Sequence, residues 1–243
     1  MAKDESKTIY FLHIRKTAGS SFFKKVKASE RAPELRSFDG FQKYFAYFLQ
    51  HPKTDLSHSI IRTHAYYGMH YFNLGHLFDS GKYTYVTILR DPIDRAISYY
   101  YYVIKERKAK YKHTDSILAS AVDLKAFYQR PKRDNEQTRI LSGRHSKFFD
   151  KCNPWLLDTA KKHLSNNFSV VGLTERFDET VSLFNQKFDW DLNPNVANAK
   201  VNLARPKQQQ LSEEILNSLR ESHKFDLELY DFAVKLFEKQ LRG

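Results

Sequence analysis

Hydrophobic residues gather in four short, nearly continuous runs along the chain, at 8–14, 59–62, 82–89 and 168–173. Runs of this kind, without a polar residue at every second position, predict strands that are buried on both faces of a sheet. The run at 82–89 is the strongest, because it is rich in β-branched and aromatic residues. Stretches with hydrophobic residues at helical spacing follow, as in Ile93, Ile97, Tyr101 and Ile104. Thr174 is placed to cap a further helix over 175–188.

The alternation of strands with helices predicts an α/β fold with a mostly parallel central sheet flanked by helices. We expect a single domain over 1–243, in which 1–7 are flexible and 200–243 form a loop and C-terminal helices packed on it. Ligands bind beyond the carboxyl ends of the strands in such sheets. The candidate site therefore comprises the loops after Ile14, Arg62 and Leu89.

The polar segment 15–21 (RKTAGSS) joins the first predicted strand to an amphipathic helix. Backbone N–H groups at the start of a helix, together with the helix dipole, form a site for anions. Gly19 lets the backbone approach a ligand closely, and Arg15 and Lys16 add positive charge. Hydroxyl groups come from Thr17, Ser20 and Ser21. The lysine precedes the glycine, so the segment is not a Walker A loop, in which lysine follows the glycines. We predict a phosphate-binding loop; the alternative is a polar turn between strand and helix.

A second anion site is predicted where the third strand ends at Arg90. Asp91 is placed to cap the next helix, with Pro92 at its first position. Ser98 lies about two turns into that helix, so its hydroxyl and the Arg90 guanidinium could bind one phosphate group. The alternative is an ion pair between Arg90 and Asp91 beside a packed helix.

Together the two elements resemble the donor-binding elements of sulfotransferases that use 3′-phosphoadenosine 5′-phosphosulfate (PAPS). The segment HIRKTAGSSF is similar to the H-x-P-K-T-[AG]-[GS]-[ST]-[ST]-F loop of glycan O-sulfotransferases, and the heparan sulfate 2-O type is the nearest group. TILRDPIDRAISYYYY, NEQTRILSG and VVGLTERFDETVSLF are also similar to that group, so the resemblance covers the chain from about Thr8 to Leu241. It implies a fold like that of the P-loop kinases, PAPS as donor and 3′-phosphoadenosine 5′-phosphate (PAP) as product.

The resemblance also implies roles for individual residues of the donor site. The 5′-phosphosulfate would be bound by Lys16, Thr17, Ala18, Gly19, Ser20 and Ser21, with Arg15 beside them. Arg90 and Ser98 would hold the 3′-phosphate. A basic loop would cover the nucleotide, and it contains Lys200, Asn202 and Arg205.

His64 follows the second predicted strand and is the candidate general base that takes the proton of the acceptor. In the family the base commonly stands in H-x-H, whereas here the first position is Arg62, which could instead bind an acidic acceptor. Lys16 would stabilise the charge that builds on the bridging oxygen. The resemblance places further residues near the acceptor, namely Asn135, Gln137, Thr138 and Arg139, with Arg144 and His145 following closely. Solvated polar residues or helix caps are the alternative roles for that group.

The net charge of +12 over 243 residues predicts an attraction to polyanions. It favours an acidic or sulfated glycan as acceptor, but a lipid, a polyketide or a small alcohol stays open. Two other functions compete: a small-molecule kinase or P-loop NTPase, with Asp91 as the Walker B residue, and a basic module that stacks RNA bases on the tyrosines at 99–102. The position of Lys16 argues against the first, and the helical spacing that buries part of the tyrosine run argues against the second.

The single cysteine, Cys152, excludes an intrachain disulfide and is expected to be a buried structural residue. The polar N-terminal segment MAKDESK lacks the apolar core of a signal peptide, and no apolar run approaches 18 residues. We therefore expect a soluble protein of the cytoplasm. No H-E-x-x-H or paired-cysteine motif occurs, so we predict no metal ion. Because part of the tyrosine run is expected in the core, we also predict no specific nucleic acid partner.

Overall fold

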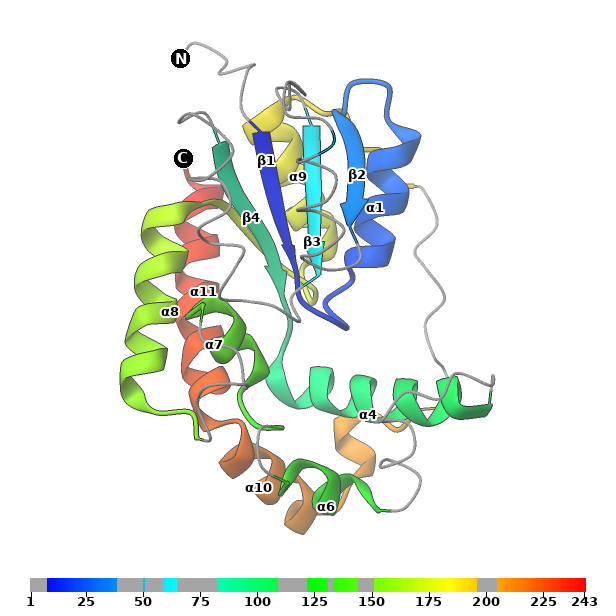
Figure 1. Ribbon diagram of the computed structural model, residues 1–243, viewed down its shortest axis with the longest axis vertical. Coiled ribbons are helices and arrows are strands. Elements are labelled where there is room, and N and C mark those ends of the chain that lie inside the picture. The colour runs from blue at the N-terminus through cyan, green and yellow to red at the C-terminus, as the bar shows by residue number, and fades with distance from the viewer. Residues whose placement is uncertain are drawn as a thin grey trace.

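In the described residues of the computed structural model, the central sheet has five strands, all parallel, in the order β2-β3-β1-β4-β5 (Figure 1). The structure describes residues 8–38, 50, 59–64, 83–108, 122–130, 133–143, 151–195 and 205–243. The strands are β1 (Thr8–His13), β2 (Glu34–Phe38), β3 (Ser59–His64), β4 (Tyr83–Leu89) and β5 (Phe168–Leu173). The expectation of a mostly parallel sheet flanked by helices is confirmed. The four hydrophobic runs form the strands β1, β3, β4 and β5.

The strand that the sequence did not predict, β2, lies at one edge of the described sheet, where it pairs with β3. Its sequence ELRSF has two hydrophobic residues, so it lacks the pattern of a buried strand. Strand β1 is central and buried along its whole length. Its register with β3 sets His13 opposite His64, so the two histidine positions are neighbours at the carboxyl edge of the sheet.

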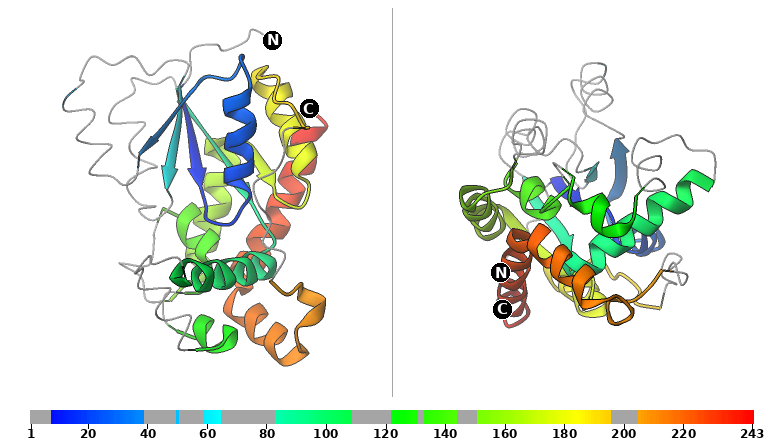
Figure 2. Two further views of the ribbon diagram at one scale, coloured as in Figure 1. Left: turned by 90° about the vertical axis from the view of Figure 1, so that its right-hand side faces the viewer. Right: turned by 90° about the horizontal axis from the view of Figure 1, so that it is seen from below.

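Helices α1 (Gly19–Ala28) and α9 (Phe177–Phe188) cover one face of the sheet (Figure 2). Helices α8 (Pro154–Asn167) and α11 (Lys224–Leu241) pack against β5 and against each other. Helix α9 begins two residues later than expected, and Thr174 does not cap it. Instead, the amide and the hydroxyl of Thr174 both donate to the Leu89 carbonyl, at 2.8 and 2.9 Å, which extends the pairing of β4 with β5.

Helix α4 (Pro92–Lys108) crosses below the carboxyl ends of the strands, where the site is expected (Figure 1). Asp91 caps it as predicted, because the Asp91 Oδ1 atom accepts from the Asp94 amide at 2.7 Å. The remaining elements gather around α4 and below it; they are α6 (Leu124–Tyr128), α7 (Glu136–Leu141), the 3₁₀ helix η2 (Gln208–Gln210) and α10 (Glu213–Ser222).

Buried side chains form two cores, one between the sheet and α1, α8, α9 and α11, and one between α4, α6 and α10. Tyr99 and Tyr100 belong to the second core, whereas Tyr102 is exposed. The tyrosine run is therefore not a continuous stacking platform. Cys152 is buried, as expected. Of the helices in the described ranges, none is long and apolar enough to cross a membrane.

Candidate functional site

The loop after β1 has the backbone shape of an anion site. Lys16 and Ala18 both adopt the left-handed conformation, with φ of 68° and 59°. Left-handed residues in such a turn let successive N–H groups point into one concavity. Ala18 stands directly before α1, and among the described residues no side chain caps that helix. The loop and the first turn of α1 therefore present backbone donors at the carboxyl end of the central strand, as the sequence predicts.

Two buried residues fix the shape of this loop. The Thr17 hydroxyl is fully buried and donates to the Ile14 carbonyl at 2.9 Å, so it closes the turn from within. The ring of His13 lies against Gly19, where an added Cβ would stand 2.3 Å from the ring atoms Cδ2 and Nε2. Gly19 is thus required by the close approach of a histidine that the sequence did not single out.

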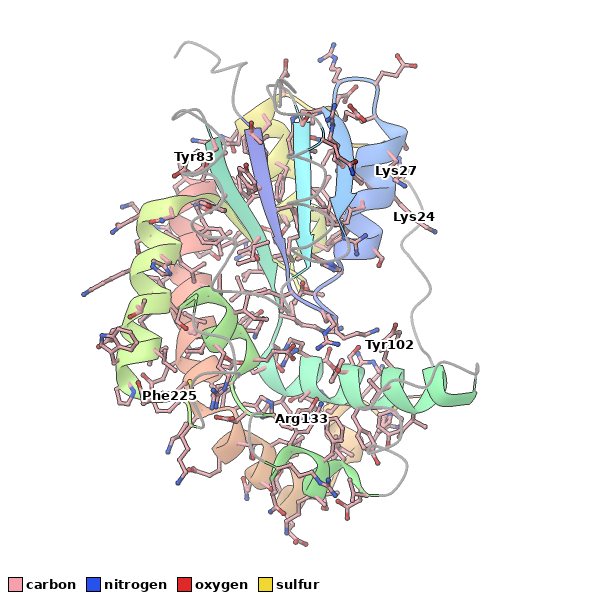
Figure 3. The ribbon with its side chains drawn as sticks, viewed as in Figure 1. Lys24, Lys27, Tyr83, Tyr102, Arg133 and Phe225 are labelled. Atoms are coloured by element: carbon pink, nitrogen blue, oxygen red, sulfur yellow. The ribbon has the colours of Figure 1, made fainter. Side chains whose placement is uncertain are left out.

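The cationic side chains of the loop extend toward α4. The Arg15 guanidinium lies 4.8 Å from the Tyr99 ring centre and 3.5 Å from the Glu136 carboxylate. The Lys16 ammonium lies 4.3 Å from the ring centre of Tyr102, which stands on the side of α4 that is turned toward the sheet (Figure 3). Lys16 is therefore held over the space between the loop and α4.

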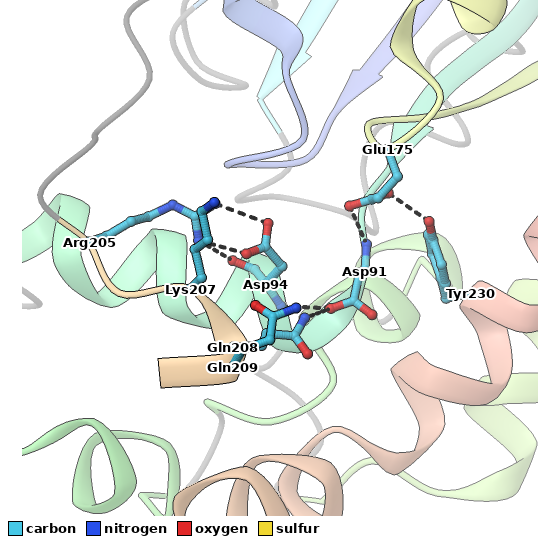
Figure 4. Close-up of a pocket in the computed structure, with 8 residues that line it drawn as sticks. All are labelled: Asp91, Asp94, Glu175, Arg205, Lys207, Gln208, Gln209 and Tyr230. Carbon is cyan, nitrogen blue, oxygen red and sulfur yellow. Dashed lines mark hydrogen bonds and ion pairs between the residues drawn. The ribbon is translucent and has the colours of Figure 1, made fainter. Parts of the chain in front are cut away.

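The second predicted anion site lies beside the loop. The Arg90 guanidinium donates from Nη1 to the Lys16 carbonyl at 3.0 Å and from Nε to the Asp94 carboxylate at 2.9 Å. Arg205 donates to the same carboxylate from the far part of the chain, at 2.7 Å from Nη1 to Oδ1 (Figure 4). Ser98 is buried on the same helix. The two predicted 3′-phosphate ligands, Arg90 and Ser98, thus lie in the α4 region. Arg205, predicted to lie in the loop that covers the nucleotide, shares the Asp94 carboxylate with Arg90.

A cavity of about 460 Å³ opens beside these arginines, between the start of α4 and η2 (Figure 4). Its lining residues are Asp91, Asp94, Glu175, Arg205, Lys207, Gln208, Gln209 and Tyr230. Glu175 joins three elements here: it accepts from the Asp91 amide at 3.1 Å and from the Tyr230 hydroxyl at 2.6 Å. Burial raises the pKa of Glu175 above its ordinary value. Burial and the bond to Glu175 also raise the pKa of the Tyr230 hydroxyl, so it stays a donor.

Asn135, Gln137 and Arg139, predicted to contact the acceptor, have side chains that are 3%, 0% and 1% exposed. The Gln137 amide brackets the backbone of Arg90: its Oε1 accepts from the Arg90 amide at 3.1 Å and its Nε2 donates to the Arg90 carbonyl at 2.9 Å. Arg139 pairs with Asp134 at 2.7 Å. The structure thus gives these side chains internal roles in the scaffold. Arg144 and His145 lie outside the described residues.

Asn135 and Asp226 cap each other's helices. The Asn135 Oδ1 atom accepts from the amides of Phe225 and Asp226, at 2.9 and 3.0 Å, in the first turn of α11. The Asp226 carboxylate accepts from the amides of Gln137 and Thr138, at 3.1 and 2.7 Å, in the first turn of α7. Through Gln137, this pair of caps fixes Arg90 to the terminal helix.

The predicted base His64 is the last residue of β3, in register with His13. The side chain of His64 lies outside the described part of the chain. Arg62 turns to β1: its Nη2 and Nε lie 2.9 and 3.3 Å from His13 Nδ1, and its guanidinium lies 4.6 Å from the Phe23 ring centre. Because arginine only donates, Nδ1 of His13 accepts, and the ring proton of neutral His13 is on Nε2. Arg62 therefore supports a histidine on the neighbouring strand.

The sequence-based prediction missed His13, Asp94, Glu175, Tyr230, Lys207 and Gln208. Asp94 carried a usable signal, because it lies four residues after Arg90 and four before Ser98, in the first turn of the helix that Asp91 caps. His13 is close to the loop in sequence, as the first residue of HIRKTAGSSF, whereas Glu175, Tyr230, Lys207 and Gln208 are brought to the site by tertiary contacts. Lys200 and Asn202, predicted to cover the nucleotide, lie outside the described residues.

Comparison with known proteins identifies relatives of the chain. The model of the sulfotransferase family matches residues 1–233. A heparin sulfate O-sulfotransferase of Drosophila melanogaster is 26% identical over 175 residues, which covers 63% of this chain and 48% of the fly protein. Heparan sulfate 2-O-sulfotransferase 1 of Gallus gallus is 26% identical over 172 residues, which covers 63% and 47%. The chain thus spans about half the length of the curated relatives that it matches.

Among solved structures, a sulfotransferase from Alicyclobacillus acidocaldarius aligns over 96% of this chain and 98% of its own. The TM-score is 0.51 and the sequence identity is 12%. This likeness supports the fold.

Proposed function

Because the chain belongs to the sulfotransferase family, we propose that it transfers the sulfuryl group of PAPS to a hydroxyl group of a carbohydrate. The observation that carries the donor half is the 3.0 Å bond from Arg90 Nη1 to the Lys16 carbonyl. This bond holds the predicted 5′-phosphosulfate loop next to the predicted 3′-phosphate residue. A nucleotide with phosphate groups at both the 5′ and the 3′ position of its ribose needs two such anion sites close together.

The residues of the chain have separable roles in this proposal. PAPS supplies a sulfuryl group already attached to a phosphate leaving group. The N–H groups of the loop and of the first turn of α1 neutralise its oxygens, and Lys16 stabilises the negative charge left on the bridging oxygen. Arg90, Ser98 and Arg205 hold the 3′-phosphate. His64 takes the proton of the acceptor hydroxyl.

An acidic glycan is the acceptor class that we propose. The two relatives described above are named for heparan or heparin sulfate, and the net charge of +12 attracts polyanions. Arg62 lies at the carboxyl end of β3 beside the position of His64, but its contacts with His13 and Phe23 indicate a supporting role more than direct contact with the glycan.

Calorimetric titration with PAP tests the donor half. We expect saturable binding that ATP with Mg²⁺ does not reproduce. Lys16→Ala should weaken PAP binding, whereas the matched control Lys24→Ala, an exposed lysine on α1, should not. A folded protein that does not bind PAP, or that turns over ATP, would refute the proposal; the second result would favour a kinase, although Asp91 already serves as a helix cap and accepts from Gln208 at 2.6 Å.

Transfer of ³⁵S-sulfate from labelled PAPS tests the acceptor half. We expect labelling of heparan sulfate or its less sulfated precursors, and His64→Ala should lower kcat by about 100-fold or more, the usual effect of a lost general base. Labelling of small alcohols or lipids in place of glycans would refute the proposed acceptor class. Near-normal turnover by His64→Ala would remove that residue from the role of base.

A further inference from the structure

Two arginines from opposite parts of the chain meet at one carboxylate, that of Asp94. We propose that Asp94 is a positioning residue for the donor: it holds the Arg90 and Arg205 guanidinium groups in place for the 3′-phosphate before the nucleotide arrives. This inference rests on the proposed function, because it assumes that Arg90 and Arg205 bind that phosphate.

The contacts of Asp94 use both of its oxygen atoms. Arg205 donates from Nη1 to Oδ1 at 2.7 Å and from Nη2 to Oδ2 at 3.1 Å. Arg90 donates to Oδ2 from Nε at 2.9 Å and also from Nη2. The side chains of Arg90, Asp94 and Arg205 are 14%, 24% and 15% exposed, so they are shielded from most of the screening that weakens surface ion pairs. Each guanidinium is thereby restricted to one orientation.

Asp94 itself is fixed by the start of α4. Its amide donates to the capping residue Asp91 at 2.7 Å, and Asp91 Oδ1 also accepts from Gln208 Nε2 at 2.6 Å. The two aspartates therefore attach the segment that carries Arg205 and Gln208 to the first turn of the helix. Without the Asp94 carboxylate, the Arg205 guanidinium would keep, of its described partners, the Asp94 carbonyl at 3.5 Å, and Gln208 would keep its bond to Asp91.

The position of Asp94 on α4 is compatible with this role. Asp94 and Ser98 are four apart on α4 and so share one face of the helix, and Arg90, just before the helix, reaches that face through its bond to Asp94. A phosphate bound by Arg90 and Ser98 lies over the turn that carries Asp94, and two guanidinium groups outweigh the one carboxylate between them. Burial by itself raises the pKa of Asp94, but the hydrogen bonds and charges of Arg205 and Arg90 outweigh it and hold the pKa below its ordinary value of 3.8. Asp94 therefore stays ionised, and able to hold both arginines, at neutral pH.

The direction in which Asp94→Asn changes the affinity for PAP separates positioning from simple charge repulsion. Asp94→Asn removes a negative charge from an anion site, so repulsion alone predicts tighter binding of PAP. Positioning predicts weaker binding, because the amide no longer holds two cations. We expect Asp94→Asn to weaken PAP binding about tenfold or more in calorimetry, since each hydrogen bond to a charged group contributes on this scale.

Adenosine 5′-monophosphate, which lacks the 3′-phosphate, distinguishes positioning from a general disturbance of the site. Its affinity should change less than about twofold in Asp94→Asn, a difference within ordinary non-additivity. Asp158→Asn, an exposed carboxylate on α8, is the control for the change of charge and should leave both ligands unaffected. Asp94→Glu keeps the carboxylate and should restore part of the PAP affinity.

A double-mutant cycle with Arg205→Met completes the test. If Asp94 acts through Arg205, Asp94→Asn should have a smaller effect on PAP affinity in the Arg205→Met protein than in the wild type. Equal or tighter PAP binding by folded Asp94→Asn, or a parallel loss of both nucleotides, overturns the inference and leaves the proposed function intact. If Asp94→Asn does not fold, the Arg205→Met and Asp94→Glu proteins provide the test. Each should lose more affinity for PAP than for AMP, and an equal loss of both would overturn the inference. Failure of the wild type to bind PAP overturns the proposed function and this inference together.

Discussion

The reciprocal caps of α7 and α11 predict a large loss of stability when Asp226 is replaced by alanine. The buried carboxylate accepts three hydrogen bonds, from the amides of Gln137 and Thr138 and from the Thr138 hydroxyl, the last two at 2.7 Å. Asp226→Ala leaves three donors without an acceptor, and each buried unsatisfied group costs about 1–3 kcal/mol, so we expect the free energy of unfolding to fall by about 3–9 kcal/mol. That is a large part of the total of about 5–15 kcal/mol for a typical domain.

Urea unfolding followed by far-ultraviolet circular dichroism measures this change. Asp231→Ala is the matched control, because Asp231 is an exposed carboxylate on the same helix, and it should change the free energy of unfolding by less than about 0.5 kcal/mol. Thr138→Val removes only the hydroxyl donor and should cost less than Asp226→Ala. A loss below about 1 kcal/mol for Asp226→Ala, within the range for one ordinary hydrogen bond, would refute the reasoning that the caps hold these helices together.

Three further predictions concern single buried sites. Gly19→Ala should lower the free energy of unfolding in the same urea assay, because the new Cβ would stand 2.3 Å from the His13 ring. The expected loss is about 1–3 kcal/mol, the usual cost of overpacking, and an unchanged urea midpoint would contradict it. Burial raises the pKa of the Cys152 thiol to about 12. Ellman's reagent at pH 8 should therefore modify the native protein about 100-fold or more slowly than the urea-unfolded chain. Equal rates would be inconsistent with a buried thiol. Burial also lowers the pKa of His223, against the opposing charge of Asp226. The unfolded chain then binds the extra proton below its pKa of about 6.5, so stability should fall as the pH drops through that value, by up to about 1.4 kcal/mol per pH unit. His223→Phe should flatten this dependence, and an identical slope in both proteins would exclude His223 as its source.

The donor side of the site was predictable because its signals are local. A strand, a polar loop with Gly19 and a helix follow one another directly, and Arg90, Asp91 and Pro92 mark the next strand end and helix start in the same way. The family match confirms the sulfotransferase prediction that these segments supported. Helix capping at Asp91 was likewise set by neighbours in sequence.

The polar interior was not predictable, because it depends on partners far away in the chain. Asn135 and Gln137 look like solvent-exposed residues in sequence, since polar side chains are mostly exposed. Their partners, Asp226 and Arg90, are 91 and 47 residues away. Arg62 was considered on its own strand, whereas its contact with His13 arises only from the parallel pairing of β1 with β3.

The meeting of Asp94 with Arg205 has a consequence for the protein during its synthesis. The two residues are 111 positions apart. At a translation rate of about 5–20 residues per second, Arg205 is therefore added on the order of 5–20 s after Asp94. Through that interval the nascent chain already contains the phosphate loop and Arg90 but not the segment that closes the cavity. A chain stalled before Arg205 should therefore form much of the sheet and still bind the nucleotide weakly, so donor binding would report that synthesis has passed Arg205.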